Sequence, residues 1–191
     1  DYGGDTIRRV KTDKVDALKI AGYCLDKWAK LSPFEPTDEH RKILKTYNRQ
    51  LSEYTKIKIM LKNNLISLLD QTFPGANELF SSPAREKDGH EKWIDFVLAF
   101  PHCHCVASLS RQKFTTKYEK WCRKNGYNFC THKAEHVYSF ALNCLPTLPN
   151  NDFAKTLIIQ TVNQLNHLCE TVAVIKSEMS KIASALPEYD M

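Results

Sequence analysis

Two aspartates, Asp13 and Asp16, stand three residues apart at the start of an apolar stretch, directly after a basic segment. On a helix, residues at this spacing lie on the same face. Carboxylates that share a face suit a hard cation such as Mg²⁺, which takes oxygen ligands and usually only one or two carboxylates per site. Sites that transfer phosphoryl groups with two metal ions contain such carboxylates. The spacing therefore allows a metal site at this pair.

The same two residues have an interpretation that needs no metal. Asp13 could cap the helix, and Asp16 could be the acidic third residue of a capping box, both favoured by the positive end of the helix dipole. Acidic first turns are common at helix N-termini, so the spacing alone favours capping and leaves the metal site open.

A second group of potential ligands lies in the segment AFPHCHCVASL and downstream of it: His102, Cys103, His104, Cys105, Cys122, Cys130, His132 and His136. Zinc takes four nitrogen or sulfur ligands, usually as C-x2-4-C with H-x3-5-H. Only His132 and His136 match half of that pattern, and consecutive ligands point in different directions. We therefore expect buried thiols and surface histidines. The alternative is that zinc stabilises the helical insert, residues 76–149, that contains these side chains. Nothing singles out a Cys–His pair of a cysteine protease.

Basic residues gather in three stretches of the chain, at 8–11, 41–49 and 113–124. Our candidates for nucleic-acid contact are Arg8, Arg9, Lys11, Arg41, Lys45, Arg49, Lys113, Lys117, Lys120, Arg123 and Lys124. Such residues contact phosphates, and Tyr118 and Trp121 could stack on unpaired bases if exposed. The alternative is a solvated charged face diluted by Glu53 and Glu119, with both aromatic residues in the core.

Composition narrows the classes of protein. The 191 residues are 42% hydrophobic with a formal net charge of +5, which permits a polyanionic partner without requiring one. No apolar run approaches the roughly 18 residues that cross a bilayer, and no signal-peptide pattern is present. The seven cysteines lack the pattern of a secreted disulfide scaffold, so we expect reduced thiols in a cytoplasmic protein without membrane partners.

Long helices are expected to position these residues. The first should run from Thr12 or Asp13 to about Lys30, where two prolines in LSPFEP break it. A second should span about Asp38 to Gln71, with Thr37 as its cap, and a last one about 152–185. Between them we expect short helices near 90–100, 110–125 and 132–144, with Gly126 ending the second of these.

The two longest helices carry apolar seams at alternating steps of three and four residues. The first seam is Leu44, Tyr47, Leu51, Tyr54, Leu61, Leu65 and Leu68, interrupted only by Lys58; the second includes Ile158, Leu165, Val172 and Met179, with Lys176 as an exception. This heptad pattern predicts a mostly α fold, in which long antiparallel coiled-coil helices flank a small helical insert. The helices could pair within the chain or across a dimer.

The segment RRVKTDKVDALKIAGY resembles the end of the RuvC-like nuclease domain of DEDD insertion-sequence transposases, a family guided by a bridge RNA. The family's K-[TN]-D-x-x-D-A-x-x-[IL]-A stretch carries the third and fourth acids of its D-E-D-D set. It matches at Lys11, Thr12, Asp13, Asp16, Ala17, Ile20 and Ala21. The resemblance continues in YNRQLSEYTKIKIMLKNNLISLLDQTFPG, LSRQKFTTKYEKWCRKNGY, KAEHVYSFA and LPEYDM.

This resemblance implies four parts. Residues 1–36 would end an α/β RuvC-like (RNase H-like) domain, 37–75 and 150–191 would be the coiled-coil helices, and 76–149 the insert. The family's first Asp and its Glu are expected upstream, and its catalytic Ser in a transposase domain beyond LPEYDM. We therefore expect this fragment to be inactive by itself.

By the same resemblance, the full enzyme would cleave and rejoin DNA, joining its serine to DNA while an acidic site holds Mg²⁺. Asp13 and Asp16 would be catalytic metal ligands. The implied partners are DNA, a guide (bridge) RNA and a second copy held through the coiled coil. The rival reading is a non-enzymatic helical interaction or nucleic-acid-binding module.

Overall fold

The computed structural model describes residues 13–30 and 38–186, and its described part is helical, without strands. The chain divides into two compact units, residues 1–38 and 39–191. The predicted mostly α fold is confirmed. No helix in the described ranges is both long and apolar enough to cross a membrane.

The first unit contains α1 (Asp13–Lys27), followed by a 3-10 turn at Trp28–Lys30, as the sequence predicted. None of the residues of α1 is buried. The large apolar residues of this segment are open to solvent: Leu18, Leu25 and Trp28 are 66%, 80% and 76% exposed. The helix therefore presents apolar side chains on its surface. Arg8, Arg9 and Lys11, and Thr37, the predicted cap, lie outside the described residues.

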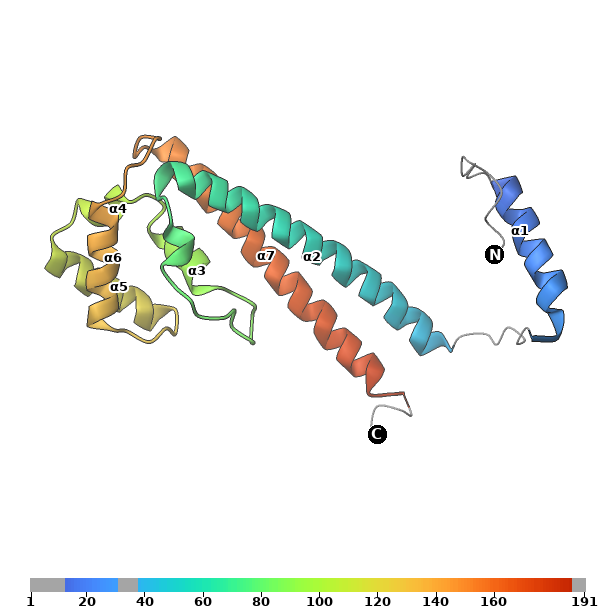
Figure 1. Cartoon of the computed structure of the whole chain (residues 1–191). Coiled ribbons are helices and arrows are strands. Elements are labelled where there is room, and N and C mark those ends of the chain that lie inside the picture. The colour runs from blue at the N-terminus through green and yellow to red at the C-terminus, as the bar shows by residue number, and fades with distance from the viewer. Residues whose placement is uncertain (1–12, 31–37, 187–191) are drawn as a thin grey trace. The chain divides into compact units, whose positions relative to one another are not determined.

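The second unit is built on α2 (Glu39–Thr72) and α7 (Asp152–Ala183), which pack side by side in opposite directions (Figure 1). The backbone amides of Thr147 and Leu148 both donate to the Gln71 carbonyl, which ties the end of α2 to the segment leading into α7. The two seamed helices thus pair within one chain. Each begins and ends within two residues of its predicted bounds.

Burial changes along this helical hairpin. The buried residues of α2 are Leu65, Leu69 and Thr72, all in its last third. Those of α7 all lie between Ala154 and Cys169. Further out, seam residues such as Leu44 and Leu51 are only half-buried. The inner part of the hairpin is therefore packed on both sides, and the outer part is a simple two-helix pair.

The inner end of the hairpin packs against the helical insert. After a 3-10 turn at Ala76–Glu78, the insert forms α3 (Lys92–Ala99), α4 (His104–Ala107), α5 (Arg111–Lys124) and α6 (Thr131–Leu142). The three predicted helices are present, and the four-residue α4 was not predicted. Gly126 follows the end of α5 with a φ of 69°, which agrees with its predicted role, because glycine adopts the left-handed region without strain.

Aromatic rings form much of the core of the insert. Phe96 lies at its centre, with ring centroids 4.9 Å from Phe100, 5.2 Å from Phe80 and 5.7 Å from Trp121. Tyr118 is fully buried, and Trp121 is 9% exposed. The suggestion that Tyr118 and Trp121 stack on bases is therefore wrong, since both rings are covered by the core.

Candidate functional site

Asp13 and Asp16 both lie in the first turn of α1, and both are exposed. Because α1 begins at Asp13, the cap position is residue 12, outside the described residues. The capping-box interpretation of the pair therefore stays a prediction, and the positive end of the helix dipole favours carboxylates in this turn. The spacing of three residues leaves both side chains on one face, open to solvent.

The pair suits a hard cation in chemistry and number. Its donors are carboxylate oxygens, and Mg²⁺ is usually bound through one or two carboxylates while it keeps several waters. Across residues 13–30 and 38–186, no group of three or more His, Cys, Asp or Glu side chains is arranged to hold a metal ion. Asp13 and Asp16 could thus supply two ligands of an octahedral ion, but not a full ligand shell.

The HCHC run is taken up by structural contacts. His102 is fully buried, in contrast to the expected surface position. Its Nε2 lies 3.1 Å from the Leu148 carbonyl, and its Nδ1 accepts a hydrogen bond from the His104 amide at 3.1 Å. Burial lowers the pKa of His102 and raises the pKa of the Cys103 thiol to about 11. These contacts favour a neutral imidazole with its proton on Nε2, which fastens α4 to the loop before α7.

The other members of that group are dispersed. Cys122 is buried in α5, while Cys130, His132 and His136 are exposed at and along α6. All seven cysteines are free thiols. Buried thiols were expected, and Cys103, Cys122 and Cys169 are buried.

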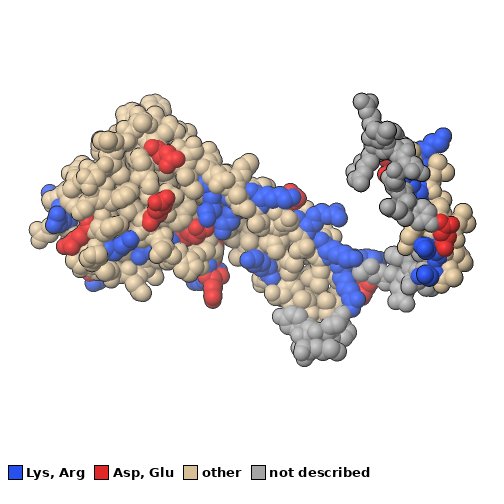
Figure 2. All heavy atoms as spheres, viewed as in Figure 1, with Lys and Arg blue, Asp and Glu red and all other residues tan. Residues whose placement is uncertain are grey.

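Basic side chains line α2, as Figure 2 shows over the hairpin. Lys45 and Arg49 are exposed on its outer half, and Arg41 lies near its start. Further along, two other lysines are occupied: Lys56 pairs with Glu53 at 2.8 Å and Lys62 with Glu91 at 2.9 Å. Lys45 and Arg49 therefore place exposed positive charge on the outer half of the hairpin.

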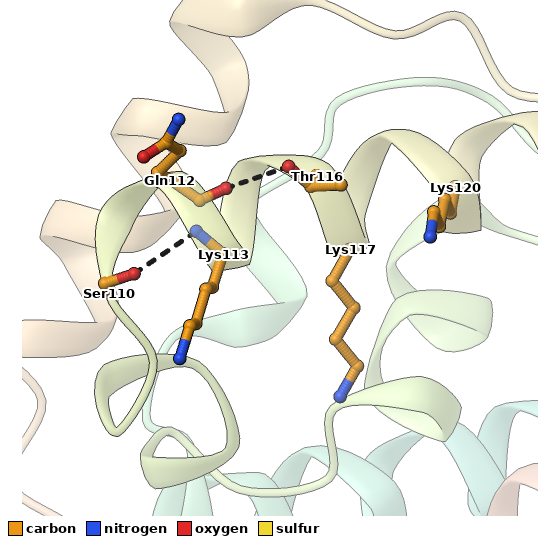
Figure 3. Close-up of a pocket in the computed structure, with 6 residues that line it drawn as sticks. All are labelled: Ser110, Gln112, Lys113, Thr116, Lys117 and Lys120. Carbon is orange, nitrogen blue, oxygen red and sulfur yellow. Dashed lines mark hydrogen bonds between the residues drawn. The ribbon is translucent and has the colours of Figure 1, made fainter.

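On α5 the structure separates the basic candidates. Lys113, Lys117 and Lys120 line an open groove of about 490 Å³ (Figure 3). Arg123 instead pairs with Glu119 at 2.6 Å. Three polar residues of the groove were missed by sequence reasoning: Ser110, Gln112 and Thr116. Ser110 and Thr116 stand three or four residues from these lysines, and that spacing was a usable signal.

A buried polar network was also missed. Asp95 accepts a hydrogen bond of 2.6 Å from the Tyr127 hydroxyl and lies 3.4 Å from the Arg85 guanidinium. Burial and the hydrogen bond to Asp95 raise the pKa of Tyr127 above its usual range. Arg85 also donates to the Asn125 carbonyl at 2.8 Å. The network joins the loop before α3 to the end of α5, and no local pattern links residues so far apart.

The comparison with protein families gives one match. Residues 1–74 match the family of IS110-type DEDD transposases, described as "Transposase". The match includes Asp13, Asp16 and all of α2. No curated protein and no solved structure matches the chain. Over residues 1–74, from its first residue to the turn after α2, the chain is similar to the IS110-type DEDD transposases.

Proposed function

We propose that this chain is the part of a DNA transposase that contributes Asp13 and Asp16 to a Mg²⁺ site and docks nucleic acid and a second copy through its second unit. The observation that carries the proposal is the family match over residues 1–74, which contains both aspartates. By the resemblance, the whole enzyme cleaves and rejoins DNA under the guidance of a bridge RNA.

The exposed pair is suited to this role. A bound Mg²⁺ would supply positive charge for the developing charge on phosphate oxygens. Asp13 and Asp16 would hold the ion through carboxylate oxygens on one face of a helix, and α1 would fix the spacing between them. Both side chains are exposed, so a cation and a phosphate can reach them without rearrangement of α1.

The metal role is tested by the double variant Asp13→Asn/Asp16→Asn, which keeps side-chain shape and removes both charges. In the complete transposase it should abolish transposition, and in this chain it should weaken binding of Mn²⁺, used as a paramagnetic probe for the Mg²⁺ site. Asp26→Asn, in the same helix, is the matched control and should leave both readouts unchanged. Undiminished transposition with undiminished Mn²⁺ binding would refute the metal role and favour the helical interaction module.

The outer hairpin supports the proposal of a second copy. Leu44, Met179 and Ala183 help to line a groove of about 480 Å³ there. A second groove, of about 210 Å³, is lined by residues that include Tyr47, Tyr54 and Ile175. The apolar residues that line these two grooves are only half-buried, and heptad seams can pack onto further helices. We infer that a second copy of the chain packs on this outer seam.

Sedimentation analysis tests the dimer. Leu44→Glu/Met179→Glu places charges in the larger groove and should give a monomer at concentrations where the parent chain dimerises. The control Ser52→Glu/Ser177→Glu adds the same charge at exposed positions and should stay dimeric. A parent chain that is monomeric at all accessible concentrations would refute this part of the proposal.

A further inference from the structure

One face of α5 consists of lysines alone. Lys113, Lys117, Lys120 and Lys124 follow one another at steps of four, three and four residues. At about 100° per residue, this spacing keeps them within about 60° of one another around the helix axis. Figure 3 shows the side chains of Lys113 and Lys117 extending to the same side of the helix. We call these four residues the α5 lysine face.

The charges of this face have no acidic partner among the residues that the structure describes. Within the described part of the chain, no carboxylate forms an ion pair with any of the four ammonium groups. The acid on the same helix, Glu119, points elsewhere and is occupied by Arg123 at 2.6 Å. Like charges at i, i+4 destabilise a helix, so repulsion among the four ammonium groups opposes the formation of α5. An anionic ligand would relieve that repulsion.

The helix that carries the lysines is held rigidly. On its other side, Phe114 and Tyr118 are fully buried in the core of the insert. The Lys117 ammonium lies 5.1 Å from the centre of the buried Phe100 ring, a cation–π contact that restrains it beside the groove. The backbone positions of the four lysines and the ammonium of Lys117 are therefore largely set before a ligand arrives, which reduces the entropy lost on binding.

The groove adds polar groups to the charges. It measures about 490 Å³ and includes Ser110, Gln112 and Thr116 beside three of the lysines. Ser110 caps α5, its Oγ accepting from the Lys113 amide at 3.4 Å, so the groove begins at the positive end of the helix dipole. Hydroxyl and amide groups beside lysines are the usual partners of phosphate oxygens.

The length of the face indicates a polymer rather than a single phosphate. Lys113 and Lys124 are 11 residues apart, or about 16 Å along the helix axis. One strand of duplex DNA presents a phosphate about every 3.4 Å of its axis, so the face matches a run of about five phosphates. No large hydrophobic side chain of α5 is exposed, which disfavours a membrane surface as the ligand.

We propose that the α5 lysine face binds the phosphodiester backbone of a nucleic acid without reading its sequence. The assignment rests on the proposed function in one respect: it assumes that the protein acts on nucleic acid, as a transposase does. It selects Lys113, Lys117, Lys120 and Lys124 from the basic candidates of the insert and leaves out Arg123, whose charge is paired.

The test uses the whole chain and measures fluorescence anisotropy with two probes, a duplex DNA and a single-stranded RNA of equal length. Lys113→Gln/Lys117→Gln/Lys120→Gln removes three charges from the groove. The matched control Lys87→Gln/Arg123→Gln/Lys176→Gln removes three charges at exposed positions elsewhere. Working in EDTA keeps metal binding out of the result, and circular dichroism confirms that each variant is folded.

We expect the groove variant to bind at least about tenfold more weakly than the control at 100 mM salt. The slope of log K against log salt should fall by about 2.7 on duplex DNA or about 2 on a single strand, since each lost phosphate contact removes about 0.9 or 0.7. The probe with the larger loss identifies the ligand. Lys113→Arg/Lys117→Arg/Lys120→Arg should bind like the parent chain, because the charge is kept.

Equal losses in the groove variant and the control would overturn the assignment, because net charge alone would then explain binding. No loss in either would overturn it as well. The metal proposal is tested independently of this one. The variant Asp13→Asn/Asp16→Asn should bind both probes like the parent chain in EDTA, whatever its transposition activity.

Discussion

Glu91 stands where α2 meets the segment before α3. Its carboxylate accepts hydrogen bonds of 2.9 Å from the Lys62 ammonium and from the Trp93 indole. The ammonium also lies 5.8 Å from the centre of the Trp93 ring. Burial acts to raise the pKa of Glu91, but the hydrogen bonds from Lys62 and Trp93 and the charges of Lys62 and Lys58 outweigh it, so the pKa is lowered. The seam interruption at Lys58 is thus part of this charged cluster.

The Glu91 contacts predict a pH-dependent loss of stability. Glu91→Gln should lower the free energy of unfolding at pH 7 by about 1.5–3 kcal/mol, the range for hydrogen bonds to charged groups. Because folding depresses this pKa, the stabilisation is present above the ordinary value of 4.5 and is lost as the pH falls through the lowered value. Urea unfolding at pH 7 and pH 3 measures both ends.

The exposed Glu86→Gln serves as the control for Glu91→Gln and should change the free energy of unfolding little at either pH. A difference between Glu91→Gln and the parent chain that is the same at pH 7 and pH 3 would contradict the role of the ionised carboxylate.

At the scale of the element, α3 is held by the face that carries Phe96. Rings from four parts of the chain surround Phe96: Phe73 after α2, Phe80 in the following loop, Phe100 after α3 and Trp121 on α5. These contacts make α3 the helix on which the insert and the inner hairpin are assembled.

Phe96→Ala should destabilise the second unit by about 3–5 kcal/mol, because it removes a fully buried ring and leaves a cavity among its neighbours. Phe153→Ala provides the control, since Phe153 on α7 is 85% exposed and its loss should change stability by less than about 0.5 kcal/mol. Chemical denaturation of the two variants compares them directly. Similar losses would show that the aromatic core does not organise this unit.

The same elements show how far sequence reasoning reaches. The seams of α2 and α7 repeat over many turns. The period of their apolar residues and the helix-breaking residues at their ends were therefore enough to place both helices within two residues. The four-residue α4 has no period to detect, because it is defined by contacts such as that of His102 with Leu148. The link between Asp95 and Tyr127 joins residues 32 apart and depends on the finished fold.

The candidate sites divide in the same way. Asp13 and Asp16 were found because their spacing is local and matches a family motif. The lysines of α5 were found by composition, but composition could not show that Arg123 is paired with Glu119 while Lys113 and Lys117 line a groove. That distinction depends on rotamers and on which face of α5 the core covers.

At the scale of the whole molecule, each unit buries its surface to a different extent. The helix of the first unit has no buried residue. In the second unit, α2 and α7 have buried residues near the insert and none toward the outer end of the hairpin. Local opening requires less free energy where few apolar contacts are broken. Stability should therefore fall from the insert toward the outer end of the hairpin.

Hydrogen exchange should reveal this gradient in the second unit. In a dilute, monomeric sample, amides in the outer segments 42–58 and 172–183 should exchange faster than those in the inner segments 62–72 and 154–169, because only the inner segments contain buried side chains. Raising the protein concentration should slow exchange in the outer segments alone if a second copy packs on the outer seam. Mass spectrometry of peptides from both regions measures the two effects in one series. Uniform exchange along α2 and α7 would contradict the gradient, and protection confined to the insert at high concentration would place the contact between copies elsewhere.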